Sequence, residues 1–341
     1  MTVKAVIDMN LKYPLIFIKL SILLLSSGCS YADNSQDEQS MLKVEQMQSW
    51  CLGRYTFKIP KESLLIGGMD KYNSFTIKSE LNASDEALRN AYAEQLKKYS
   101  DKNMKIIEDK AEIKNGNKII KIFKAKYGKD SRGANDVFAW VLDRGTLFSI
   151  TGTYSLKYKD LSDEALNNLV NHISFRNNTN LPKQAGVCIN NGFITDSGDP
   201  YRNSIHSFGF ELKQYPSLRI FLETEALARA TSDLITRTNY NLKKEGFLTK
   251  TNIKTIRKGT KAQISGDGLE GFEWVVKTPM LEKDGVLATW EYLGTPRLAT
   301  DPLIQLEIDT GYDRNNVQTA SMNETVSIQL YEIILNTIKK F

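Results

Sequence analysis

Histidine and cysteine, the residues that most often carry nucleophilic or metal chemistry, are scarce in this chain. Its 341 residues include two histidines and three cysteines, which is too little material for a histidine-based metal centre or for several histidine-dependent sites. The sequence also lacks a GxSxG elbow, an HExxH or CxxC motif and a P-loop. Together these absences weigh against an enzyme, and no catalytic, cofactor-binding or metal-binding residue is predicted.

Long runs of one charge are missing as well. Lys and Arg number 45 against 40 Asp and Glu, a formal net charge of +5. Basic residues occur in blocks no longer than a pair or two, so a nucleic-acid footprint is not supported. With 41% hydrophobic and 25% charged residues, the chain is neither disordered nor an integral membrane bundle. Its length favours two domains.

The first 28 residues are predicted to be a secretory signal peptide. A basic start precedes an apolar stretch that is shorter than the ~20 apolar residues a spanning helix needs. Small residues then precede Cys29, as in a bacterial lipobox, whose cysteine becomes the acylated first residue of the mature protein. We therefore predict lipidation of Cys29, a lipidated tether over 29–47 and a periplasmic location. Ser30 favours the outer membrane as the site of anchoring. A short transmembrane anchor is the alternative.

Two cysteines remain once Cys29 is assigned to the anchor. In an oxidising periplasm, the pair Cys51 and Cys188 is typical of a disulfide. The chain-entropy model assigns a loop of this length on the order of 5 kcal/mol of stabilisation. Two separate buried thiols are the alternative. A catalytic cysteine is disfavoured because neither His172 nor His206 lies in a recognisable nucleophile context.

The same order of features appears twice along the chain: a strand, a helix, a strand meander and a second helix. In the first half these are a strand at 55–59, a helix begun by Ser84, strands at 119–127, 137–143 and 146–154, and a helix capped by Ser162. In the second half they are a strand entry at Cys188, a helix at 223–245, strands at 262–265, 272–278, 287–293 and 303–310, and a helix with Ser321 and Glu324 as its capping box.

This order predicts an α+β fold of two similar domains, each an antiparallel sheet with helices packed on one face. The predicted domains span 48–178 and 188–341, joined by a linker at 179–187. The similar segments 137–141 and 271–275 suggest equivalent strands and a tandem duplication. Chance resemblance between two α+β segments is the alternative.

Few side chains qualify as candidate site residues. Glu307 and Asp309 alternate along a strand, where solvated carboxylates are the default and paired acid/base groups a remote alternative. For His172 and His206, surface or packing roles are expected. Gly-rich residues 266–271 lack the lysine and following helix of a phosphate loop and are expected to form a turn.

Aromatic residues in predicted loops are the candidate partner-binding residues. They are Tyr201, Tyr215 and Tyr292. Loop aromatics are favoured anchors in protein interfaces, although single exposed aromatics are also ordinary.

An ordered set of residues at the domain openings resembles a known family. The set comprises Trp50 to Tyr55 with Pro60, Val187 to Ile189 with Gly192 to Ile194, Gly271 to Trp274, Leu306 with Glu307, and Thr310 with Gly311. This layout resembles, over about residues 46–341, the two-domain type VI secretion immunity proteins that neutralise lipase effectors. Within this Tli group it is most similar to the proteins paired with the fourth class of effector.

The resemblance implies a non-enzymatic periplasmic inhibitor, without a cofactor, whose two domains grip a cognate phospholipase and protect the producer and its siblings. Occlusion of the lipase entrance or restraint of its lid would be the mechanism. The alternative is an envelope lipoprotein that binds or carries a lipid, which a continuous cavity would favour and filled cores would oppose. A hydrolase would need a cleft that gathers Glu307 or Asp309 with His206.

Overall fold

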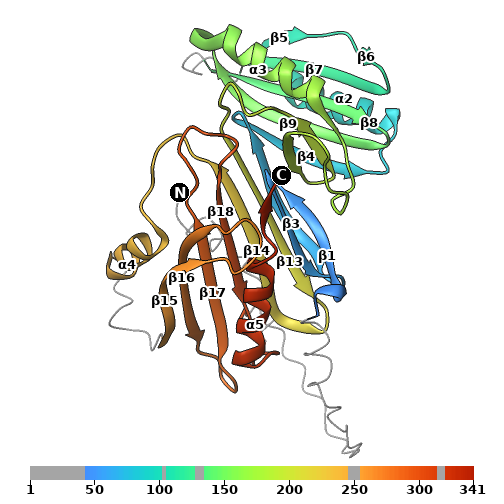
Figure 1. Ribbon diagram of the computed structural model, residues 1–341. Helices are drawn as coiled ribbons and strands as arrows, with labels where there is room; N and C mark the ends of the chain where they lie inside the picture. Colours follow the sequence, from blue (N-terminus) through green and yellow to red (C-terminus); the bar gives the residue numbers. More distant parts are fainter. Residues whose placement is uncertain (1–42, 102–104, 127–133, 245–253, 313–318) are drawn as a thin grey trace, which may run out of the picture. The chain divides into compact units, whose positions relative to one another are not determined.

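The computed structural model describes residues 43–101, 105–126, 134–244, 254–312 and 319–341. This part of the chain is mostly β, with antiparallel strands and few helices (Figure 1). None of its helices is long and apolar enough to cross a bilayer. Cys29 and the signal segment lie outside the described residues.

The elements of the first half run to Phe175. They are η2 (Val44–Gln46), β1 (Met47–Leu52), β2 (Tyr55–Pro60), β3 (Leu64–Tyr72), β4 (Phe75–Leu81), α2 (Asp85–Asp101), β5 (Lys105–Asp109), β6 (Ile113–Asn115), β7 (Lys118–Lys126), β8 (Ala134–Asp143), β9 (Thr146–Ser155), η3 (Leu156–Tyr158), α3 (Lys159–His172) and β10 (Ile173–Phe175). The segment predicted as a tether therefore ends in the short helix η2 and the first residue of β1.

The elements of the second half begin at Gly186. They are β11 (Gly186–Ile189), β12 (Gly192–Thr195), β13 (Ser204–Leu212), β14 (Tyr215–Ala226), α4 (Leu234–Lys244), β15 (Lys254–Ala262), β16 (Glu270–Thr278), β17 (Gly285–Tyr292), β18 (Leu303–Asp309), α5 (Glu324–Leu335) and β19 (Lys339–Lys340).

One antiparallel sheet runs through both halves. Its order is β15-β16-β17-β18-β14-β13-β3-β4-β9-β8-β7-β5, with β6 paired to β7. The halves meet where β13 pairs with β3, from Ser204 opposite Tyr72 to Glu211 opposite Leu64. Two three-stranded sheets, β1-β2-β19 and β10-β12-β11, complete the described strands.

The two halves share one strand order, counted outward from their junction. On one side the order is β3, β4, β9, β8, β7, β5, and on the other β13, β14, β18, β17, β16, β15. The prediction that segments 137–141 and 271–275 form equivalent strands is nevertheless wrong. The first segment lies in β8, the fourth strand from the junction, and the second lies in β16, the fifth strand from the junction. The shared order is what a tandem duplication requires, and duplication itself stays a proposal.

Helices cover both faces of the sheet, which corrects the prediction of one helical face. In β8, Val137 and Val141 pack in the core that contains α3, whereas Trp140 packs in the core that contains α2. In the second half, Trp290 of β17 faces the core of α5, and its neighbour Glu291 on the opposite face pairs with Arg237 of α4. Strands buried on both faces need a helix on each side.

Each of the two large hydrophobic cores contains residues from both halves of the sequence. The β1–β2 hairpin comes first in the chain, yet Trp50, Tyr55 and Phe57 pack with strands β13 to β18 and helix α5. The β11–β12 hairpin opens the second half, yet Val187 and Ile194 pack with strands and helix α3 of the first. Each half thus closes its core with the hairpin that precedes the other half.

Helix α4 starts later than the predicted residues 223–245. The segment up to Ala226 extends strand β14, whose residues alternate between buried and half-buried positions, and the Thr224 hydroxyl donates to the carbonyl of Leu303 at 2.7 Å. The helix begins after Asp233, whose carboxylate accepts a hydrogen bond from the N–H of Thr236 at 2.8 Å. Asp233 is therefore the N-cap of α4.

The last helix and one strand also differ from their predicted limits. Asn323, rather than Ser321, caps α5 by accepting from the N–H of Val326 at 2.9 Å; Ser321 instead contacts Ser217. Strand β15 ends at Ala262, where a strand over 262–265 was expected. Of the turn expected over 266–271, residues 266–267 form a turn and Glu270 and Gly271 begin strand β16.

Candidate interaction surface

The disulfide between Cys51 and Cys188 is present, as predicted from the cysteine pair. The two Cα atoms are 5.8 Å apart, and both side chains are buried together with Phe193. Backbone hydrogen bonds in both directions between Gly53 and Cys188, at 2.9 and 2.7 Å, accompany it. Because β1 and β11 belong to different cores, this bond ties the two exchanged hairpins to each other.

A buried ionic network surrounds the disulfide. Arg54 donates to the carboxylate of Asp196 at 2.7 Å and to the carbonyl of Gly186 at 3.1 Å. The hydroxyl of Tyr72 donates to the same carboxylate at 3.1 Å. Burial lowers the pKa of Arg54, opposed by the Asp196 charge, and burial together with Asp196 raises the pKa of Tyr72. The network links the chain at the β1–β2 turn to strand β11 and to the residue that follows β12, and its three side chains are all buried.

His206 has a packing role at the junction, as expected, although its partner is distant in sequence. It lies in β13 opposite Asp70 of β3, and its Nδ1 is 2.9 Å from a carboxylate oxygen of Asp70. The other oxygen accepts from the N–H of Asn190 at 2.9 Å. His172, the other histidine, is exposed at the end of α3 and contacts the carbonyl of Asn168.

Glu307 and Asp309 lie on one face of strand β18, as their alternation predicts. They are half-buried rather than fully solvated. Burial and the neighbouring Asp309 raise the pKa of Glu307 to about 7, and burial raises the pKa of Asp309 to about 6 against a hydrogen bond from the Gly311 N–H. These carboxylates therefore hold their protons more tightly than surface carboxylates do.

The hydrolase arrangement does not form. His206 aligns with Thr224 of β14 and, through it, with Ile304 of β18, whereas Glu307 aligns with Phe221. Ile304 and Glu307 are three positions apart along the strand, an odd offset, so their side chains point to opposite faces of the sheet. His206 and the two acids therefore lie on different sides of it, and a shared cleft is ruled out. Among the described residues, no group of three or more His, Cys, Asp or Glu is placed to hold a metal ion.

The same face of the sheet carries further carboxylates beside these two. Glu223 and Glu225 of β14 share it, and burial, together with their mutual repulsion in the case of Glu223, raises the pKa of both. Arg219 is the basic neighbour of Glu307 and Asp309 on this face, where its guanidinium also lies over the ring of Tyr312 at 4.9 Å.

The three candidate tyrosines lie in different environments. Tyr201 is half-buried in a loop and donates to the carbonyl of Ala226 at 2.7 Å. Tyr215 is the first residue of β14 rather than a loop residue, and at 4% exposure it has almost no surface to offer a partner. Tyr292 ends β17, and its hydroxyl donates to Asp301. Contact between these residues and a partner stays a prediction.

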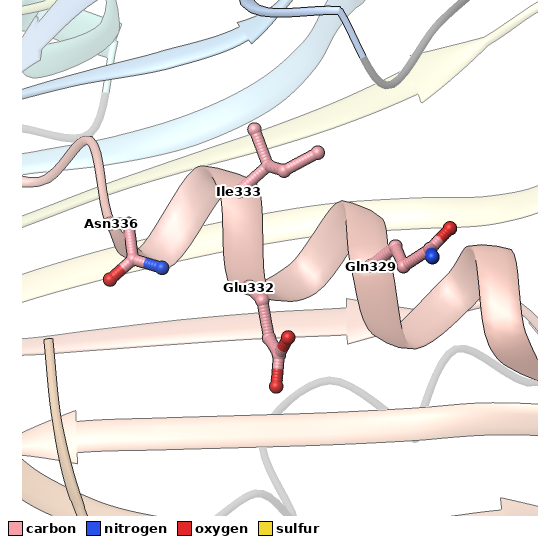
Figure 2. A pocket seen from close by; sticks show the side chains of 4 residues that line it. All are labelled: Gln329, Glu332, Ile333 and Asn336. Carbon is pink, nitrogen blue, oxygen red and sulfur yellow. The ribbon is translucent and has the colours of Figure 1, made fainter. Parts of the chain in front are cut away.

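A shallow, open depression lies on helix α5. Its lining side chains come from the middle and the end of this helix and from the residue that follows it (Figure 2): Gln329, Glu332, Ile333 and Asn336. Glu332 already pairs with Arg257 at 2.8 Å. The depression is open to solvent rather than an enclosed cavity, and the large aromatic residues Trp290, Tyr55 and Phe208 are fully buried in a hydrophobic cluster. Neither feature favours the lipid-carrier alternative.

Two family models divide the chain between them. The Tle cognate immunity protein 4 N-terminal domain matches residues 48–178, and the C-terminal domain of the same family matches residues 180–340. The chain belongs to this family. The prediction of a two-domain type VI secretion lipase immunity protein is therefore confirmed. No curated protein matches the chain closely enough to count as a relative.

Solved structures show the same fold. The apo immunity protein TplEi of the type VI secretion system of Pseudomonas aeruginosa aligns with a TM-score of 0.72 at 16% identity, over 88% of this chain and 98% of that one. A chain from a Tle4–Tli4 complex aligns with a TM-score of 0.72 at 16% identity, over 87% and 98%. TplEi with an "L" peptide gives 0.67 at 15% identity, over 87% and 99%. At such identities the likeness establishes the fold.

Proposed function

We propose that this chain is a periplasmic immunity protein that binds and inhibits a cognate type VI secreted phospholipase. The observation that carries the proposal is the match of both family domains, which together span residues 48–178 and 180–340. A structure with this fold has been solved as a Tle4–Tli4 complex, which supports a lipase as the partner. The chain would protect its producer, and siblings that make the same protein, from the toxin.

Inhibition by capture suits the construction of this molecule. The two halves are joined by the β3–β13 pairing, by the Cys51–Cys188 disulfide and by the buried Arg54–Asp196 pair. A partner that is already rigid loses less conformational entropy on binding, so more of the contact energy appears as affinity. We infer that the chain acts by blocking the lipase entrance or holding its lid, without catalysis of its own.

Anchoring at the outer membrane is the second part of the proposal. The small residues before Cys29 and the Ser30 after it support acylation and outer-membrane sorting. A tethered inhibitor would stand where a phospholipase attacks. Cys29→Ala should leave the exported chain free in the periplasm and remove acyl labelling of the protein. Unchanged membrane association of this variant would contradict the anchor and leave the inhibitory role intact.

The inhibitory role is tested with the purified mature chain and a lipase captured from the parent strain with that chain as bait. Fatty-acid release from phospholipid vesicles is measured as the chain is added, with the same chain irreversibly unfolded as the control. Suppression near equal molar amounts, with a stable complex on gel filtration, is the expected result. Full lipase activity at a tenfold excess of folded chain would overturn the proposal. Retained lipid without any protein partner would instead favour the carrier alternative.

A further inference from the structure

Strand β3 has an outer edge that is unpaired over most of its length. On its inner side it pairs with β13 from Leu64 to Tyr72. On its outer side, β4 pairs with it only from Asp70 to Tyr72, and β4 then continues along β9. Among the described strands, none pairs with the outer edge between Leu64 and Met69. The large sheet therefore has an unpaired strand edge at its middle, where the two halves meet.

The open edge differs in chemistry from the two ends of the same sheet. Strand β15, at one end, carries four basic residues: Lys254, Arg257, Lys258 and Lys261. Strand β5, at the other end, is five residues long, carries Lys105, Glu108 and Asp109, and is interrupted by a bulge. Charges, short length and bulges are the usual protections against pairing with another chain. The open edge of β3 reads LLIGGM, without any charge, and its one bulge lies at Ile66.

The side chains on this edge are apolar and accessible. Leu64 is 59% exposed and Ile66 is 37% exposed. Ile66 is the extra residue at a shift of register with β13, and it lies over Gly209 on the sheet face opposite the core. At Gly67, an added Cβ would meet nothing within 4 Å, so the sheet face is uncovered beside this residue. Leu65 packs against the core on the other face.

An extended peptide is the ligand that matches this edge. Alternate residues of an edge strand direct N–H and C=O groups outward, and a second strand satisfies them in register. An incoming strand also places alternate side chains on both faces of the sheet, beside Leu64 and Ile66 on one and Leu65 on the other. A lipid tail has no groups to pair with these amides. A run of about six residues, roughly 20 Å long, would fill the edge.

We propose that the outer edge of β3, from Leu64 to Met69, binds an extended apolar segment of the lipase as an added strand. The inference rests on the proposed function and names the part of the inhibitor that holds the enzyme. The edge belongs to the strand that pairs with β13 of the second half, and its Leu65 packs against the core of that half.

Amide hydrogen exchange of the full mature chain, alone and with the lipase, is the direct test. In the free chain the outward amides of residues 64–69 should exchange quickly, and in the complex alternate amides should be protected. Ile66→Lys and Leu64→Lys place a charge on the edge and should weaken lipase binding by about tenfold or more, as expected for central interface positions. Leu281→Lys, at a residue 80% exposed outside the edge, is the matched control and should bind normally. Equal thermal midpoints of all three variants establish that folding is intact.

The outcomes separate this inference from the proposed function. If the lipase is inhibited at equal molar amounts while residues 64–69 exchange as in the free chain and Ile66→Lys inhibits normally, the edge inference is wrong and the immunity role stands. If the folded chain neither binds nor inhibits the lipase, both fail. If the chain alone is a dimer that Ile66→Lys dissociates, the edge pairs with a second copy, and the lipase segment is excluded as its partner.

Discussion

Removing the Cys51–Cys188 disulfide should destabilise the chain strongly without unfolding it. The bond joins residues separated by 137 positions, and the chain-entropy relation for such a loop gives about 17 cal/mol/K, or about 5 kcal/mol at 25 °C. The folded state keeps other ties at this point, including the Gly53–Cys188 backbone pairs and the Arg54–Asp196 ion pair. We therefore expect Cys51→Ala/Cys188→Ala to fold and to lose about 3–5 kcal/mol of unfolding free energy.

Alanine is the suitable replacement because both sulfurs lie against Phe193, where a serine hydroxyl would lack a partner. Urea unfolding followed by tryptophan fluorescence measures the loss in oxidised, reduced and double-variant protein. At about 2.1 cal/mol/K per residue for roughly 300 folded residues, 5 kcal/mol corresponds to about 8 °C in the thermal midpoint. Reductant should lower the wild-type stability to that of the variant and leave the variant unchanged.

The disulfide should also determine where the fold first loosens. Hydrogen exchange in the double variant should rise most in the hairpins at 47–60 and 186–195, which the bond connects, and least in the central strands β17 and β18. A double variant within about 1 kcal/mol of the wild type, with both wild-type cysteines shown to be oxidised, would refute the loop-entropy reasoning.

Three further predictions use matched pairs of variants. Asp196→Ala leaves Arg54 buried without its partner and should cost about 3–5 kcal/mol in urea unfolding, whereas Glu94→Ala, at the exposed pair with Lys98, should cost under about 0.5 kcal/mol; equal losses would contradict the role of burial. Gly53→Ala should cost more than Gly116→Ala, because both glycines have positive φ but only at Gly53 would the new Cβ lie 2.3 Å from Thr224; equal thermal midpoints would contradict the close contact. In the folded state the pKa of Glu307 is raised to about 7, so the folded state binds a proton that the unfolded state releases near pH 4.5. The stability contributed by this carboxyl is therefore full below about pH 4.5 and is lost as the pH rises towards 7. Glu307→Gln should flatten this part of the pH–stability curve, whereas Glu270→Gln should not; identical curves for the wild type and both variants would contradict the raised pKa.

Local sequence patterns predicted the elements that depend on neighbours in the chain. Strands β7, β8 and β9 and helix α2 were found close to their observed limits, because apolar spacing, caps and tight turns are properties of short segments. The predicted cap of helix α3 is wrong: the helix begins at Lys159 after the 3-10 turn η3, so Ser162 lies inside it. Strand β3 was missed because its segment LLIGGM does not alternate between apolar and polar residues and contains two consecutive glycines, Gly67 and Gly68. Strand β14 was misread at residues 223–226, where its alternating pattern runs into a helix-like series of Leu and Ala.

The sequence by itself determined the repeated order of elements and the family to which the chain belongs, and it predicted the disulfide between the two remaining cysteines. The secretory leader stays a prediction, because it lies outside the described residues. Only the tertiary structure decided that the hairpins are exchanged between the cores, that His206 meets Asp70 across the junction, that Tyr215 is buried, and that the edge of β3 is open. Each of these depends on pairings between residues more than a hundred positions apart or on the packing around them. Such pairings depend on the free energy of the whole assembled sheet, and local propensity does not predict which strands will be neighbours.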